Sequence, residues 1–160
     1  MEVYRIIPYT DEQWMRLAIQ EAMKAEELGE VPIGAILVKD QQVIGRGYNR
    51  REIDKDALAH AEIMAISDAS RTLGGWRLPD TTLYVTLEPC PMCAGAILQA
   101  RIPRVVYGTG DPKAGCAGTL YNLLQDERFN HQVQVTSNVL QQECTQLLKN
   151  FFRKLRASKR

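Results

Sequence analysis

The sequence lacks long apolar runs. No stretch approaches the roughly 20 apolar residues that cross a bilayer, and residues 1–10 lack the charged-then-apolar pattern of a secretory signal. We therefore expect no membrane association and a cytoplasmic protein. The chain also lacks internal repeats, low-complexity tracts and linker-like segments. With 160 residues, 45% hydrophobic and 24% charged, it is typical of an ordered globular protein, and we expect a single domain over residues 1–160.

Cysteine and histidine are scarce, with four and two residues. Disulfides are rare in the cytoplasm, so two cysteines three positions apart, Cys90 and Cys93, are better read as metal ligands or redox groups. Cys116 and Cys144 stand alone in the sequence.

Net charge is also nearly absent, at +1. That balance hides an asymmetry, because six of the 20 basic residues lie in the last twelve positions, which contain no acid. A basic cluster of this kind indicates a polyanionic partner. It equally suits a helix C-terminus, where cations complement the macrodipole, so both interpretations stay open.

The remaining patterns predict alternating helices and strands. A capping box at Thr10 and Gln13 opens a helix that ends at Gly29, and glycines in the next two strands allow bulges or close backbone approach. The predicted strands are 33–39, 43–48, 82–87, 104–108 and 132–136, and the later helices begin near 61, 91 and 139. This order predicts an α/β layered domain with an initial hairpin and crossover helices.

The last helix has an apolar stripe with a 3.6-residue period from Val139 to Leu155. Phe152 fits this stripe together with Leu148, so we expect these side chains to pack in the core. Arg153 and Lys154 fall beyond the stripe and are the better candidates for contact with the polyanionic partner.

A candidate metal site is formed by Cys90, Cys93 and His60. The two cysteines lie on one side of a first helical turn, whose free N–H groups stabilise thiolates. His60 supplies a third ligand, and three protein ligands are typical of catalytic zinc with one open position, where bound water reaches a pKa of about 7. Glu62 lies two residues after His60, on another side of the helix, and is predicted to shuttle protons as general base and then general acid.

These residues match the zinc-deaminase pattern of His-x-Glu followed by Pro-Cys-x-x-Cys. The sequence resembles the cytidine deaminase superfamily and, within it, the bacterial tRNA-specific adenosine deaminases of the TadA type. The segments that carry the resemblance are VPIGA (31–35), GYN (47–49), AHAEI (59–63), LYVTLEPCPMCAGA (83–96), DxKxG (111–115) and FFR (151–153). They span nearly the whole chain.

The resemblance implies hydrolytic deamination of adenosine to inosine at position 34, the wobble position, of a tRNA anticodon, by attack of zinc-bound hydroxide on adenine C6. It also implies one Zn²⁺ per subunit, a homodimer that binds the anticodon stem-loop, and a three-layer α/β/α fold with a central mixed five-stranded sheet. Asn49 is expected to hydrogen-bond the flipped base, although by pattern alone it is a turn residue.

The resemblance places the loop with Asp111 and Lys113 at the mouth of the site. There Asp111 is a candidate acceptor for a ribose 2′-OH, and Lys113 a candidate partner for a phosphate.

Three other functions remain open. A deaminase of free bases or nucleosides, such as guanine or cytosine, would share the zinc residues. A thiol oxidoreductase would use Cys90 and Cys93 but leaves His60 and Glu62 without a role. A structural zinc module that binds RNA would need a fourth ligand, and no other Cys or His has suitable spacing.

Overall fold

The computed structural model describes residues 7–159. Its elements are α1 Asp11–Glu27, β1 Gly34–Lys39, β2 Gln42–Tyr48, α2 Ala61–Leu73, β3 Thr82–Leu87, α3 Pro91–Gln99, β4 Arg104–Thr109, the short 3-10 helix η1 Leu123–Gln125, β5 Gln134–Thr136 and α4 Gln141–Ser158. The predicted order of helices and strands is confirmed, and η1 was not predicted. Residues 1–6 and Arg160 lie outside the described range. The first six belong to the segment predicted to lack a secretory signal, and Arg160 belongs to the basic cluster.

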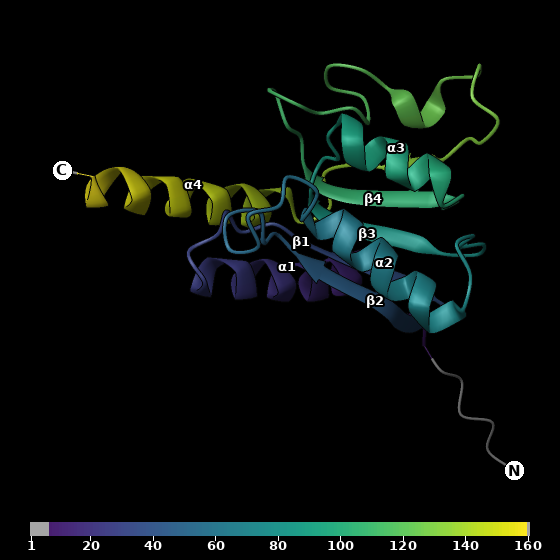
Figure 1. Cartoon of the computed structure of the whole chain (residues 1–160), viewed down its shortest axis with the longest axis horizontal. Coiled ribbons are helices and arrows are strands. Elements are labelled where there is room, and N and C mark those ends of the chain that lie inside the picture. The colour runs from purple at the N-terminus through teal and green to yellow at the C-terminus, as the bar shows by residue number, and fades with distance from the viewer. Residues whose placement is uncertain (1–6, 160) are drawn as a thin grey trace, which may run out of the picture.

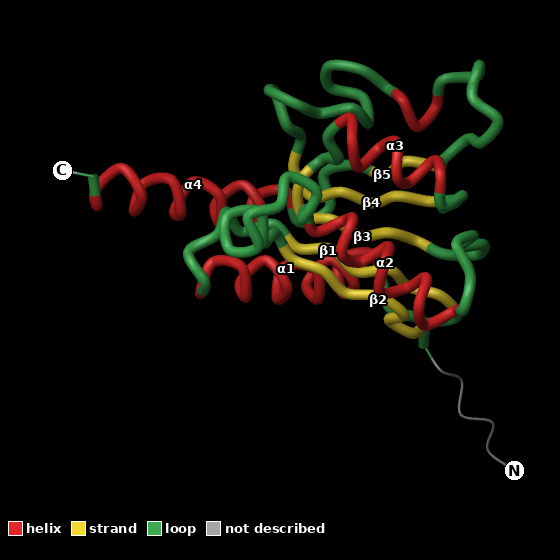
Figure 2. Tube along the Cα trace, viewed as in Figure 1, coloured by secondary structure: helices red, strands yellow, loops and turns green. Residues whose placement is uncertain are grey.

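The five strands form one mixed sheet in the order β2-β1-β3-β4-β5. Helices α1 and α4 cover one face and α2 and α3 the other, which confirms the predicted three-layer α/β/α fold (Figures 1 and 2). Within residues 7–159 no helix combines the length and apolar character that a bilayer crossing requires.

Strand directions bring three loops to one edge of the sheet. β1 is antiparallel to both β2 and β3, while β3, β4 and β5 are parallel to one another. The carboxyl ends of β2, β3 and β4 therefore point the same way, toward the edge where open α/β sheets bind their ligands. The segments that follow these strands begin at Asn49, Glu88 and Gly110.

Alternate residues of the central strands pack into two separate cores. Leu37, Val85 and Val105 face α2 and α3, whereas Ile36, Tyr84 and Val106 face α1 and the start of α4. Each of these six side chains is buried, so the period-2 alternation of β1, β3 and β4 holds the sheet between both helical layers.

The ends of the early elements form as predicted. The Thr10 hydroxyl accepts the Gln13 N–H at 3.2 Å, and the Gln13 side chain accepts the Thr10 N–H at 2.8 Å, which completes the capping box. The hairpin between β1 and β2 turns through Asp40 and Gln41, both with positive φ, as in the two-residue turns that match strand twist.

Glycine allows α2 to approach the sheet closely. A Cβ at Gly47 would overlap the backbone of the first turns of α2, and a Cβ at Gly45 would overlap the backbone near Ala65 and Ala69. The predicted close backbone approach is confirmed, and it fixes the N-terminus of α2 against the end of β2.

Helix α4 does not pack along its whole apolar stripe. Among its residues only Cys144 is buried, against β4 at Gly108, and the later turns extend beyond the sheet (Figure 1). Phe152 is 39% exposed and Leu148 is half-buried, so the expectation that these two side chains pack in the core is wrong for the single chain. The periodicity marked a common side of the helix, but β4 ends before that side can be covered.

Candidate metal and substrate site

Three potential metal ligands meet at the carboxyl edge of the sheet. His60 and Cys90 are the N-cap residues of α2 and α3, and Cys93 lies in the first turn of α3. Their ligand atoms all lie within 4.8 Å of one another, and no fourth His, Cys, Asp or Glu joins this cluster among residues 7–159. The fold therefore brings together the three residues that the sequence predicted as ligands.

The distances in the cluster suit a tetrahedral zinc ion. The Nδ1 atom of His60 lies 3.6 Å from the Sγ atom of Cys90 and 3.5 Å from that of Cys93. Zinc bonds of about 2.05 Å to nitrogen and about 2.3 Å to sulfur at the tetrahedral angle place those atoms about 3.6 Å apart. Two thiolates and an imidazole are also preferred zinc donors, so both geometry and chemistry fit this metal.

The cluster is electrostatically prepared to hold a cation. The Cys93 thiol, helped by His60, hydrogen-bonds to Cys90 and lowers the pKa of Cys90 to about 4. The same hydrogen bond, together with burial, raises the pKa of Cys93. A divalent ion bound here takes the place of thiol protons, because the metal ligand is the thiolate.

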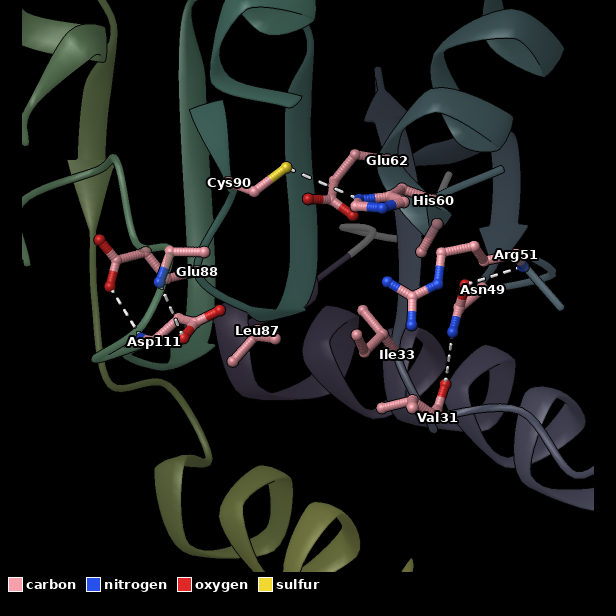
Figure 3. Close-up of a pocket in the computed structure, with 12 residues that line it drawn as sticks. Val31, Ile33, Asn49, Arg51, His60, Glu62, Leu87, Glu88, Cys90 and Asp111 are labelled. Carbon is pink, nitrogen blue, oxygen red and sulfur yellow. Dashed lines mark hydrogen bonds between the residues drawn. The ribbon is translucent and has the colours of Figure 1, made fainter. Parts of the chain in front are cut away.

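Glu62 lies beside the cluster and is almost inaccessible to solvent. It occupies the first turn of α2, only 4% exposed, and lies next to His60 and Cys90 (Figure 3). Burial, which disfavours the carboxylate, raises the pKa of Glu62 to about 7. A carboxyl group with this pKa can accept and donate a proton near neutral pH.

A cavity of about 220 Å³ opens in front of the cluster (Figure 3). This volume is at the small end of protein ligand sites and suits a single small ring system better than a larger ligand. All three loops at the carboxyl edge contribute to its lining, together with the start of α2, the end of β3 and the segment before β1. The lining residues are Val31, Ile33, Asn49, Arg51, His60, Ala61, Glu62, Leu87, Glu88, Cys90, Asp111 and Ala114.

Asn49 lines this cavity and also serves the loop around it. Its side-chain Nδ2 donates to the Val31 carbonyl at 3.2 Å, and its Oδ1 accepts the Arg51 N–H at 3.1 Å. Both roles foreseen from the sequence are therefore compatible. A carboxamide has four hydrogen-bonding capacities, and these contacts use only two.

Asp111 stands where the cavity meets a larger groove of about 920 Å³. Its Oδ1 accepts the backbone N–H groups of Lys113 at 2.9 Å and Ala114 at 3.2 Å, which turns the loop at the site mouth. Lys113 lines the groove.

The groove carries five cations and one acid. Its charged lining residues are Arg51, Lys113, Lys149, Arg153, Arg156 and Asp111. They come from three distant parts of the chain, and the cationic wall contributed by α4 faces the loop that follows β4. Arg153 is thus beside the site, as its assignment to substrate binding required.

Lys154 lies in a different place. It lines a separate hollow with Glu26 and Glu27, between α4 and the end of α1. The structure therefore brings Asn49, Asp111, Lys113 and Arg153 to the site but not Lys154. A helical turn of about 100° per residue puts neighbouring residues on different sides of α4.

Arg51 was not predicted from the sequence. It lines both the cavity and the groove, and its side chain projects toward the cavity from the loop after β2 (Figure 3). In the sequence it is one charge within a polar loop, and only its place two residues after Asn49 hints at a role.

Comparison with known proteins gives a consistent result. The MafB19-like deaminase family matches residues 9–156. The tRNA-specific adenosine deaminase of Bacillus subtilis (strain 168) is 57% identical over 150 residues, which cover 94% of this chain and 93% of the relative.

Solved structures agree with the sequence matches. One, from studies of A-to-I editing by tRNA:A34 deaminases at the wobble position of transfer RNA, has a TM-score of 0.81 and 46% identity, and the match covers 85% of this chain and 99% of that one. A guanine deaminase from Bacillus subtilis has a TM-score of 0.63 and 30% identity, over 89% of this chain and 95% of that one.

Proposed function

The chain belongs to the family of tRNA-specific adenosine deaminases, and from that premise we propose that it hydrolyses adenosine to inosine at position 34 of a tRNA anticodon. The proposal rests on one observation, the connection between the cavity at the metal ligands and the cationic groove. A cavity of base size at the His60, Cys90 and Cys93 cluster opens into a groove lined by five cations. A free base needs only the first space, whereas a polynucleotide needs both.

We assign His60, Cys90 and Cys93 as the ligands of one Zn²⁺ per chain. When bound, the ion supplies the Lewis acidity that makes water nucleophilic near neutral pH. His60 and Cys90 are held at the N-caps of α2 and α3, and Cys93 is held in the first turn of α3.

Glu62 is the proposed proton shuttle. Its carboxylate takes a proton from the attacking water and delivers it to a ring nitrogen of adenine. In a second transfer it moves the proton of the added hydroxyl to the amino group, which leaves as ammonia. Water adds at C6, the C6–N6 bond breaks, and the products are inosine and ammonia. Burial of Glu62 keeps bulk water from competing for these protons.

The proposed substrate contacts lie in the base cavity and in the cationic groove. Asn49 has spare hydrogen-bonding capacity toward the flipped base, and Asp111 at the mouth is the proposed acceptor for a ribose 2′-OH. Lys113 and Arg153 are proposed to bind phosphates, joined by the other groove cations. We infer that Lys154, which faces α1, takes no part in the groove.

We further propose, from the family resemblance, that two chains form a homodimer and that the protein acts in the cytoplasm, where tRNA is found. Light scattering on the purified protein at micromolar concentration tests the dimer. A mass of one chain of 18.1 kDa would contradict it.

Sequencing of total tRNA after incubation with the purified protein tests the reaction. Inosine is expected at position 34 of tRNAs with a wobble adenosine, and it should be absent with the Glu62→Ala variant. Parallel incubations with free guanine and cytosine cover the alternative of a free-base deaminase, an activity named for a structural relative of the same fold. Ammonia release from either base, without inosine in tRNA, would overturn the proposal.

A further inference from the structure

Glu88 is a buried carboxylate that the proposed chemistry does not use. It follows β3 directly, two residues before Cys90, and is 2% exposed. No cation among residues 7–159 forms an ion pair with it. An ionised group in this position is stable only if hydrogen bonds replace its hydration.

Four donors from a single loop replace that hydration. Oε1 of Glu88 accepts the Asp111 N–H at 3.0 Å, and Oε2 accepts the N–H groups of Ala117 and Thr119, both at 3.0 Å. The Thr119 hydroxyl donates a further, short hydrogen bond to Oε1. All four donors belong to residues 110–119, the segment that also carries Lys113. Figure 3 shows the first of these contacts, between Glu88 and Asp111.

Backbone contacts on both sides hold the same two segments together. The Glu88 N–H donates to the Thr109 carbonyl at 2.9 Å, and the Cys116 N–H donates to the Pro89 carbonyl at 2.9 Å. A Cβ at Gly115 would overlap the Glu88 carboxyl group, so glycine is what lets the loop close around it.

The pattern of donors requires a carboxylate. Both oxygens of a carboxylate only accept, whereas a glutamine at this position would turn an NH₂ group toward N–H donors. Aspartate is one methylene shorter and cannot reach donors spread over nine residues of loop. The four donors therefore require the carboxylate group of Glu88, and a side chain of similar volume does not replace it.

We propose that Glu88 is a positioning residue. It orders residues 109–119, so that Asp111 and Lys113 stand at the mouth of the base cavity and contact the substrate. The proposal rests on the proposed function for the identity of that substrate. Loop contacts that hold RNA equally in the ground and transition states act on KM and leave kcat unchanged.

The test compares Glu88→Gln with wild type on an anticodon stem-loop RNA carrying adenosine at position 34. KM is expected to rise about tenfold, because a loop that is ordered for only about a tenth of the time weakens binding by that factor. The kcat value should stay within about twofold, and zinc content should remain one per chain. Hydrogen exchange of the amides in 109–119 should accelerate in the variant.

A matched control is Glu21→Gln. Glu21, in α1, is another 2% exposed carboxylate and is bound by Lys24 at 2.8 Å. The Glu21→Gln variant is expected to have a lower melting temperature and an unchanged KM, as for a carboxylate with a purely structural role.

A KM within twofold of wild type in folded Glu88→Gln would overturn the proposal. A loss of zinc and kcat together would also overturn it, since Glu88 would then support the metal cluster. If Glu88→Gln does not fold, Thr119→Val decides, because it removes one donor and spares the carboxylate. A raised KM supports the proposal and an unchanged KM refutes it. If the wild-type protein does not act on RNA, hydrogen exchange still shows whether Glu88 orders residues 109–119. Failure of the proposed function can therefore be distinguished from failure of the Glu88 proposal.

Discussion

Two adjacent cations of α4 offer a sharp test of the groove. Arg153 lines the groove beside the site, whereas Lys154 lines a hollow next to Glu26 and Glu27. Each is changed to glutamine, so the two variants lose the same charge from neighbouring positions of one exposed helix. A tail that attracts RNA only through its overall charge treats them alike. A groove that holds phosphates does not.

The size of the effect follows from the five cations of the groove. Each phosphate contact with a single strand contributes about −0.7 to the slope of log K against log salt, so five contacts give about −3.5. Between 50 and 200 mM salt that slope weakens binding about 130-fold. Arg153→Gln should reduce the slope to about −2.8, and the triple change of Lys149, Arg153 and Arg156 should reduce it to about −1.4, which leaves only a sevenfold loss.

The assay is fluorescence anisotropy of a labelled anticodon stem-loop over a salt series. The Glu62→Gln background prevents turnover during the titration. Lys154→Gln should keep the wild-type slope. Equal slopes for the Arg153 and Lys154 variants, or a wild-type slope near zero, would refute the groove as the RNA-binding surface.

Three further predictions concern the metal site, an ion pair and a close contact. Glu62→Gln should retain one zinc per chain by elemental analysis while inosine formation falls at least about 100-fold; loss of zinc would show that it serves the metal instead. Asp11→Asn should lower the free energy of unfolding in urea by about 1.5–3 kcal/mol at pH 7. Arg104, which bonds Asp11 at 2.7 and 2.9 Å, lowers the pKa of that carboxyl, so its contribution is complete above pH of about 4 and disappears as the pH falls through the lowered value. A difference between variant and wild type that does not shrink as the pH falls below the ordinary range of an aspartate would contradict the ion pair as its source. Gly47→Ala should cost about 1–3 kcal/mol by overpacking against α2 and reduce turnover, whereas Gly75→Ala, which meets no neighbouring atom, should be near neutral by thermal melting.

Much of the fold was predictable because its signals are local. The capping box at Thr10, the left-handed Gly74 that ends α2, and Pro91 at the first position of α3 each act within one or two turns. The alternation in β1 and β3 follows from burial on both faces. η1 escaped prediction because a three-residue 3-10 turn has no periodicity to detect.

The site was predictable where chemistry restricts the residue type. Cys90, Cys93 and His60 are distinctive because few other roles require them together. Arg51 was missed because an arginine in a polar loop is usually solvated, and its place depends on how the loop folds back.

Phe152 was misplaced for a related reason. Helical periodicity tells which residues share a side, but the length of the sheet decides how far that side is covered. Similarly, Lys154 could not be told from Arg153 without knowing the angle at which α4 leaves the sheet.

The attachment of α4 separates recognition from catalysis. Only its first turns are anchored, through Cys144 against Gly108 and a 2.9 Å hydrogen bond between the hydroxyls of Thr145 and Thr109. Substitutions in the later turns therefore reshape the groove wall at low cost to folding, and none of those turns supplies a metal ligand. Substitutions in the protruding part of α4 can therefore change the class of substrate during evolution. The metal ligands at the N-termini of α2 and α3, and with them the reaction, stay the same.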